Sequence, residues 1–177
     1  MTQSNHNFYQ AFAEQIAAQA KKCLLITNQD IEYSYADIDQ ESARLANYLG
    51  KLGACVGDRI SVQVEKSPQA VCLYLACLRA GFVFHPLNPA YQASELDYFL
   101  NNAEPSVVIC DSDKLDSLRP IVDAANISHL LTLNADGTGG LIDESRASSA
   151  EFVCVDREAD DMAALLYSSG TTGTPKG

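Results

Sequence analysis

The sequence predicts an α/β fold with a largely parallel sheet covered by helices, and three observations support this. Strand-like segments alternate along the chain with segments of helical periodicity. Residues 105–111, PSVVICD, are apolar with no polar face, which is typical of a parallel strand buried on both sides. Residues 68–80 are apolar nearly all round, which indicates a helix buried between two layers. Hydrophobic residues make up 47% of the 177-residue chain, enough for one domain with a sizeable core.

The chain begins with patterns for a helix and a hairpin. Residues 7–21 predict an amphipathic helix because apolar residues recur at a spacing of four, at Phe8, Phe12, Ile16 and Ala20. Two apolar or alternating segments then flank the turn residues NQD, which predicts a β-hairpin.

A capped helix and a strand follow the hairpin. Ser34 stands three residues before Asp37, as in a capping box, and Gly53 is a suitable stop for the helix. In GDRISVQVE, Ile60, Val62 and Val64 recur at alternate positions, which favours a strand.

The central part of the chain contains strong helix boundaries. Ser67 and Pro68 fit the N-cap and first position of a helix, and Gly81 fits the position just beyond its end. The next segment, FVFHPLNP, predicts a short strand stopped by two prolines. Ser94 is expected to cap the helix that follows, whose inward-facing residues are Leu96, Phe99, Leu100 and Ala103.

The last third has weaker signals. We expect a helix over about 113–125, a strand at 129–133, a flexible loop at 134–140, an exposed polar segment at 143–151, and strands at 151–155 and 161–169. The acidic pair at 160–161 is expected to lie in a solvated turn, and His85 is expected to be structural rather than catalytic.

Charge and cysteine usage exclude several classes of function. The net charge of −11 disfavours nucleic acid and anionic lipid as partners, so any anion site must be local. The six cysteines form no CxxC pair and the three histidines stand alone, so we expect no metal site and reduced thiols. No signal peptide and no membrane-spanning run of about 20 apolar residues is seen, which favours the cytoplasm. No oligomeric state is predicted.

The segment SSGTTGTPKG, residues 168–177, has the parts of a phosphate-binding loop. Its glycines allow close approach of the backbone, its hydroxyls are donors, Lys176 adds a positive charge, and a strand leads into it. The spacing differs from a Walker A loop. The competing interpretation is a hydrophilic linker, which shares this composition.

The motif YSSGTTGTPKG, residues 167–177, resembles the phosphate-binding motif of the adenylate-forming (AMP-binding) superfamily. That superfamily includes acyl-CoA synthetases, adenylation domains of nonribosomal peptide synthetases, and luciferases. The usual form is Y-T-S-G-[ST]-T-G-x-P-K-G, and Ser168 in place of threonine keeps the hydroxyl. Upstream, YSYADIDQESARLANYL and CLRAGFVFHPLNP resemble two further motifs in the family's order, and residues 86–111 look most like malonyl-CoA synthetases.

The resemblance implies an ATP-dependent carboxylate–CoA ligase that forms an acyl-adenylate and transfers the acyl group to CoA, with a short-chain or malonyl-type acid. It implies ATP and Mg²⁺ as cofactors and CoA as co-substrate. Lys176 is the expected catalytic residue, and the expected phosphate-binding residues are Ser168, Ser169, Gly170, Thr171, Thr172, Gly173, Thr174 and Lys176.

The resemblance also implies that residues 1–177 are the N-terminal portion of an AMP-binding domain, inactive alone. Two alternatives remain: an adenylation domain of a nonribosomal peptide synthetase, and a folded α/β module without catalysis. We expect residues 163–167 to pair in the sheet and residues 168–177 to be irregular.

Overall fold

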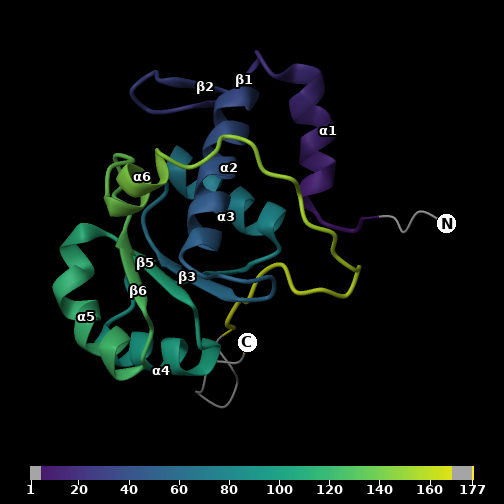
Figure 1. Cartoon of the computed structure of the whole chain (residues 1–177). Coiled ribbons are helices and arrows are strands. Elements are labelled where there is room, and N and C mark those ends of the chain that lie inside the picture. Colours follow the sequence, from purple (N-terminus) through teal and green to yellow (C-terminus); the bar gives the residue numbers. More distant parts are fainter. Residues whose placement is uncertain (1–4, 169–176) are drawn as a thin grey trace.

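The computed structural model, which describes residues 5–168 and Gly177, confirms the α/β fold. Its main sheet has four parallel strands in the order β4-β3-β5-β6, and a separate antiparallel hairpin is formed by β1 and β2 (Figure 1). The strands are β1 (Cys23–Ile26), β2 (Glu32–Ser34), β3 (Arg59–Gln63), β4 (Val83–Pro86), β5 (Val107–Cys110) and β6 (His129–Thr132). The helices are α1 (Tyr9–Gln19), α2 (Tyr35–Lys51), α3 (Pro68–Ala80), α4 (Ala93–Ala103), η1 (Ser112–Lys114), α5 (Leu115–Ala124) and α6 (Gly140–Ser145).

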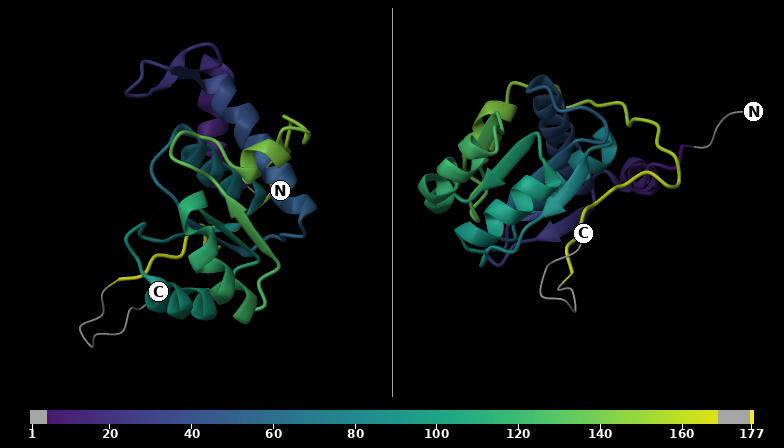
Figure 2. Two further views of the ribbon diagram at one scale, coloured as in Figure 1. Left: turned by 90° about the vertical axis from the view of Figure 1, so that its left-hand side faces the viewer. Right: turned by 90° about the horizontal axis from the view of Figure 1, so that it is seen from below.

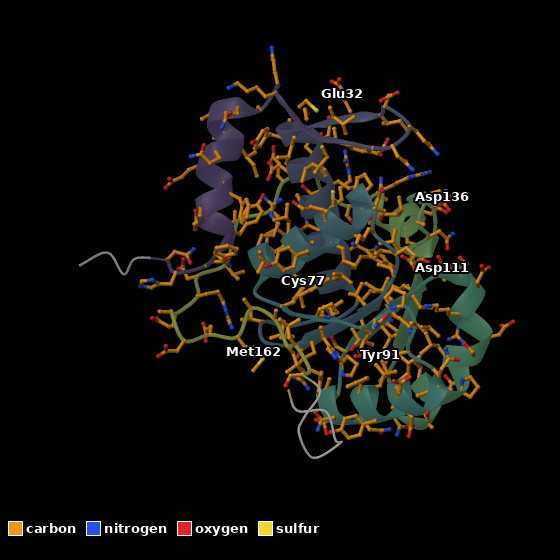
Figure 3. All side chains as sticks on the ribbon, turned by 180° about the vertical axis from the view of Figure 1, so that it is seen from behind. Glu32, Cys77, Tyr91, Asp111, Asp136 and Met162 are labelled. Carbon is orange, nitrogen blue, oxygen red and sulfur yellow. The ribbon has the colours of Figure 1, made fainter. Side chains whose placement is uncertain are left out.

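Helices cover both faces of the sheet, as the apolar strand at 105–111 predicted. One core joins α1, α2, α3 and α6 to the side chains of Ile60, Val62, Val107 and Ile109. A second core joins α4 and α5 to Val108 and Cys110 on the opposite face (Figure 2). Side chains fill the space between α3 and the sheet around Cys77 (Figure 3). Since β5 has apolar side chains on both faces, it is buried throughout.

The strand order creates a switch point between β3 and β5. The connection from β3 through α3 leads to β4 on one side, whereas the connection from β5 through α5 leads to β6 on the other. In open parallel sheets, ligands bind at such a point, outside the carboxyl ends of the strands. The fold therefore directs attention to the carboxyl edge of the sheet around β3 and β5.

Local capping signals are confirmed for two helices and wrong for one. Ser34 and Asp37 form the expected capping box, and Ser67 caps α3, which ends at Gly81 in the left-handed conformation (φ 70°). Ser94 does not cap α4. The helix begins at Ala93, two residues earlier than a cap at Ser94 would place it; Gln92 and Glu95 form its capping box, so Ser94 lies within the first turn.

Two expectations for the last third are also corrected. Residues 151–155 form no strand; they run along α3 instead, where the Phe152 carbonyl accepts from the Arg79 guanidinium and Val155 N–H donates to the Arg79 carbonyl. The polar segment expected to be exposed contributes to α6, where Ser145 is fully buried with Leu141 before it. In both cases the segment packs against helices that are distant in the sequence, so its local composition could not predict its conformation or its burial.

A buried arginine joins α1, α2 and α3. The Arg79 guanidinium donates to the backbone and carboxylate oxygens of Asp39 and to Ser42 Oγ, and it lies 4.5 Å from the centre of the Tyr9 ring. The Arg79 side chain is buried, whereas the side chain of Asp39, its ion-pair partner at 3.1 Å, is 33% exposed. Within the residues described, no helix is long and apolar enough to cross a membrane.

Candidate functional site

The segment that leads into the predicted phosphate loop lies beside β4. Phe84 N–H donates to the carbonyl of Ala163 (3.0 Å), and Leu165 N–H donates to the carbonyl of Phe84 (3.0 Å). The pairing is parallel, through a bridge between Phe84 and Ala164. The expected pairing of residues 163–167 is therefore confirmed at this point, although the segment is not a full strand. Its direction carries Tyr167 to the carboxyl end of β4, at the edge of the sheet where ligands are expected.

Tyr167 is held in this place by aromatic neighbours from other segments. Its ring centre lies 4.8 Å from that of Phe99 in α4 and 5.4 Å from that of His85 in β4. Phe99 in turn stacks on Tyr91 at 4.9 Å, and the Tyr167 hydroxyl donates to Asn102. Burial raises the pKa of Tyr167, so its hydroxyl stays protonated as a donor. The stack fixes the position from which Ser168 continues.

Within the predicted phosphate loop, residues 168–177, the structure describes the first residue, Ser168, and the last, Gly177. Ser168 directly follows Tyr167. A Cβ placed on Gly177 would lie 2.9 Å from Tyr167 Cε1, so both described ends of the motif lie against the same tyrosine. The other predicted site residues, Ser169, Gly170, Thr171, Thr172, Gly173, Thr174 and Lys176, lie outside the described residues, as does the expectation that this stretch is irregular.

A pocket of about 380 Å³ opens beside the start of the loop. It is lined by Tyr91, Ser94, Glu95, Tyr98, Phe99, Tyr167 and Ser168. The aromatic rings offer flat apolar surface and the hydroxyls offer donors next to Ser168, a combination that suits a ligand with polar and apolar parts.

Three buried polar residues lie under this site, and the sequence did not predict their burial. Ser61 and Gln63 in β3 are fully buried, as is His85 in β4. Ser61 Oγ lies 2.8 Å from His85 Nδ1, and the two residues are paired in register. Burial lowers the pKa of His85 to about 4, with the charge of Arg59 as a lesser cause, so the ring is neutral near pH 7. The available signal was the parallel sheet itself, because a central strand covered on both faces has no solvated side.

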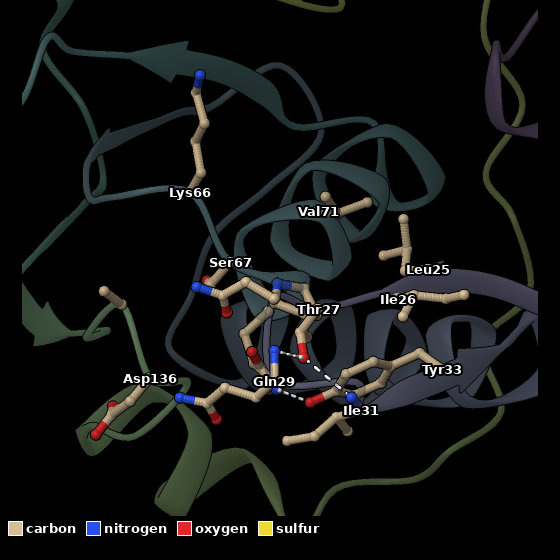
Figure 4. Close-up of a pocket in the computed structure, with 14 residues that line it drawn as sticks. Leu25, Ile26, Thr27, Gln29, Ile31, Tyr33, Lys66, Ser67, Val71 and Asp136 are labelled. Carbon is tan, nitrogen blue, oxygen red and sulfur yellow. Dashed lines mark hydrogen bonds between the residues drawn. The ribbon is translucent and has the colours of Figure 1, made fainter.

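A larger pocket of about 440 Å³ lies elsewhere, between the β1–β2 hairpin and the start of α3 (Figure 4). Lys66 and Asp136 are among its lining residues, and no residue that lines it is fully buried. It is an open groove of mixed character that shares no lining residue with the pocket beside Tyr167, and we assign it no chemistry.

Among the described residues, no group of three metal-ligating side chains is present.

Known proteins match almost the whole chain. The chain is 42% identical to ATP-bound MatB from Rhodopseudomonas palustris, with a TM-score of 0.92 over 98% of this chain and 34% of that one. It is 31% identical to the uncharacterized acyl-CoA ligase YtcI of Bacillus subtilis, over 93% of this chain and 32% of that protein. It is 30% identical to a polypeptide of the linear gramicidin synthase of Brevibacillus parabrevis, over 99% of this chain and 2% of that protein.

The chain thus spans about a third of the length of the ligases that it matches, and a smaller share of the gramicidin synthase polypeptide. The model of the AMP-binding enzyme family matches residues 12–177, from the first helix through the whole of the predicted phosphate loop. This chain belongs to the AMP-binding enzyme family.

Proposed function

We propose that residues 1–177 are the N-terminal portion of the AMP-binding domain of an ATP-dependent carboxylate–CoA ligase. The observation that carries the proposal is the placement of Tyr167 and Ser168 at the carboxyl end of β4, in a chain of this family. A motif rich in hydroxyl and glycine residues that starts there is suited to a polyphosphate, because its N–H and O–H donors meet the ligand at the expected edge of the sheet.

The reaction has two steps. A carboxylate oxygen of the acid attacks the α-phosphorus of ATP, and the bond from that phosphorus to the bridging oxygen of pyrophosphate breaks. The thiolate of CoA then attacks the acyl carbon of the adenylate and expels AMP. Negative charge grows on the departing pyrophosphate in the first step, so donors placed around it lower the barrier.

Residues of this chain would have three different roles in the first step. Ser168, Ser169, Thr171, Thr172 and Thr174 would donate to the phosphate oxygens, and Gly170 and Gly173 would let the backbone turn close to them. Lys176 would neutralise charge on the pyrophosphate. Mg²⁺ supplies further neutralisation when bound, and we assign it no ligand among the described residues.

The acid is proposed to be short-chain or malonyl-type. This rests on the resemblance of residues 86–111 to malonyl-CoA synthetases, and it is consistent with the 42% identity to MatB. A second candidate is an adenylation domain that delivers its acyl group to a carrier-bound phosphopantetheine thiol, which the similarity to the linear gramicidin synthase favours.

Acid-dependent exchange of pyrophosphate into ATP tests the proposal on the longer protein that contains this chain. A panel of carboxylic acids that includes malonate should give exchange with at least one acid, and CoA should then yield a thioester. Exchange without thioester formation on CoA, but with transfer to a carrier protein, would select the second candidate. No exchange with any acid would contradict both.

The 177-residue chain alone is expected to form no CoA thioester, since it spans only about a third of the ligases it matches. Thioester formation by this purified chain would show that residues 1–177 are sufficient for catalysis, contrary to the proposal.

A further inference from the structure

Two buried polar atoms near Tyr167 have no hydrogen-bond partner among the residues that the structure describes. They are His85 Nε2 and Gln63 Oε1, and both side chains are fully buried. An unpaired buried polar group destabilises a fold by about 1–3 kcal/mol, so native proteins rarely leave two of them in one cluster. The pair therefore points to a group that joins them.

The first atom is a donor, which follows from the hydrogen bond on the other side of the ring. His85 is neutral, so one ring nitrogen carries a proton and the other accepts. The Ser61 hydroxyl has a hydrogen to donate, and its contact is His85 Nδ1 at 2.8 Å. If Nδ1 carried the proton, both the Ser61 hydrogen and the Nε2 lone pair would be unpaired. The arrangement that satisfies more groups has Ser61 donating to Nδ1, with the proton on Nε2.

The second atom is an acceptor, and its orientation is fixed by two backbone carbonyls. Gln63 Nε2 donates to the carbonyls of Asn88 and Tyr91, each at 3.1 Å. Rotation of the amide by 180° would bring its oxygen against these two carbonyls, where no hydrogen is available. Gln63 Oε1 consequently faces away from the 88–91 turn as an acceptor.

The donor and the acceptor lie on one face of two adjacent strands. Ser61 pairs in register with His85, and Gln63 follows Ser61 by two residues, on the same side of β3. Contacts around this face close a ring: His85 touches Tyr167, Tyr167 touches Phe99, Phe99 stacks on Tyr91, and the Tyr91 carbonyl accepts from Gln63. The unpaired donor and the unpaired acceptor therefore lie on one face of the sheet, within a ring of contacts that includes the aromatic side chains of Tyr167, Phe99 and Tyr91.

We propose that one internal water accepts a hydrogen bond from His85 Nε2–H and donates one to Gln63 Oε1, and that the resulting Ser61–His85–water–Gln63 network positions Tyr167 at the start of the phosphate loop. A water with two such partners meets the requirement for an ordered buried water. His85 is then a positioning residue that acts through Tyr167, and its influence on catalysis rests on the proposed function.

Nitrogen-15 NMR of the 177-residue chain tests the network directly. The chain has three histidines, and His85 is assigned by loss of its signals in His85→Gln. We expect the neutral Nε2–H tautomer at pH 7, with a cross-relaxation peak from that proton to a long-lived water. In Ser61→Ala the tautomer should become mixed, because the hydroxyl that holds Nδ1 as an acceptor is gone. A dominant Nδ1–H tautomer in the unmodified chain, or an Nε2–H without contact to water, would overturn the proposal.

A matched pair of variants tests positioning in the longer ligase. The amide nitrogen of Gln at position 85 can occupy the place of His Nε2, whereas that of Asn reaches only the place of Nδ1. His85→Gln should therefore retain pyrophosphate exchange within about 3-fold of the unmodified rate. His85→Asn should lower turnover by ~10-fold or more, with the KM for the acid unchanged, as expected when a reactive loop is displaced. Equal turnover in the two variants would contradict the positioning role.

The NMR experiment and the exchange assay together distinguish failure of this inference from failure of the proposed function. If the NMR result holds but no acid supports exchange in the unmodified ligase, the proposed function fails and the network stands. If exchange is normal but the tautomer is Nδ1–H, the inference fails and the function stands.

Discussion

The two clusters of buried polar side chains differ in how fully they are paired within the described part of the chain. Around Arg79, between α1, α2 and α3, the guanidinium has the Asp39 oxygens, Ser42 Oγ and the Phe152 carbonyl as partners, and only its Nε lacks one there. On the opposite side of the sheet, the cluster of Ser61, Gln63 and His85 has an unpaired atom on each of its two larger side chains.

Their places in the fold explain the contrast. The Arg79 cluster ties three helices together within one layer, so its partners come from the fold itself. The Ser61–Gln63–His85 cluster lies under Tyr167, where the chain enters the phosphate motif at the carboxyl edge of the sheet. Nearly complete pairing indicates a structural role, whereas unpaired buried groups at a ligand-binding edge indicate a site that takes a partner.

Removing the arginine should have the largest effect on stability. Arg79→Ala removes the buried guanidinium's hydrogen bonds to Asp39, Ser42 and the Phe152 carbonyl, and since a hydrogen bond to a charged group contributes about 1.5–3 kcal/mol, we expect a total loss of about 3–5 kcal/mol. The free energy of unfolding in urea measures this. Arg146→Ala is the matched control, since the Arg146–Asp143 pair is exposed and is expected to contribute at most about 1 kcal/mol. A loss below about 1 kcal/mol in Arg79→Ala would show that this cluster is not structural.

Acid should destabilise the other cluster through His85. Its pKa is about 4 in the folded chain against 6.5 for an ordinary histidine, so below pH 6.5 the unfolded chain binds the proton more readily. Stability should therefore fall as pH drops from about 6.5 to about 4, by roughly 3 kcal/mol from this residue, and the contribution should not change further below that range.

The difference between the unmodified chain and His85→Gln isolates this contribution from that of the carboxylates. Urea unfolding at several pH values gives a curve of stability against pH for each chain, and the unmodified chain should lose roughly 3 kcal/mol more than His85→Gln between about pH 6.5 and pH 4. Parallel curves would mean that His85 is as easily protonated in the folded state as in the unfolded one.

Removing the serine hydroxyl should have a smaller effect. Ser61→Ala leaves His85 Nδ1 without its donor, which is expected to cost about 1–3 kcal/mol in the free energy of unfolding. Ser112→Ala at an exposed position serves as the control, with an expected change within about 0.5 kcal/mol. If Ser61→Ala and Ser112→Ala are equally stable, the Ser61–His85 hydrogen bond does not stabilise the fold. Of the two clusters, the one around Arg79 would then be the one whose hydrogen bonds do.

Features set by neighbouring residues could be predicted from the sequence. The cap at Ser67 and the stop at Gly81 depend on local backbone chemistry, so the bounds of α3 were correct. The strand at 105–111 was correct because its composition fits only a doubly covered sheet. The start of α4 was wrong because Gln92 and Ser94 compete over one turn, and the helix register decides between them.

The candidate site was only partly predictable for the same reason. The motif proposed to bind phosphate is contiguous, so reading residues 167–177 is enough to suggest it, and its role stays a prediction. The residues that surround it come from β3, β4 and α4, which are distant in sequence, and their meeting depends on strand order. The burial of Ser61 and Gln63 was not predicted, because polar residues that alternate with apolar ones in a strand resemble a solvated face, whereas α4 packs on this side of the sheet.

Pyrophosphate exchange by the Lys176→Ala variant of the longer ligase tests most directly the claim that the motif after Tyr167 binds the phosphates of ATP. Lys51→Ala, an exposed lysine in the last turn of α2, is the control. We predict that Lys176→Ala lowers turnover by ~10-fold to ~1000-fold, with little change in the KM for the acid, because its charge acts on the departing pyrophosphate. The control should be unaffected. An unchanged turnover with only a raised KM for the acid would contradict the account.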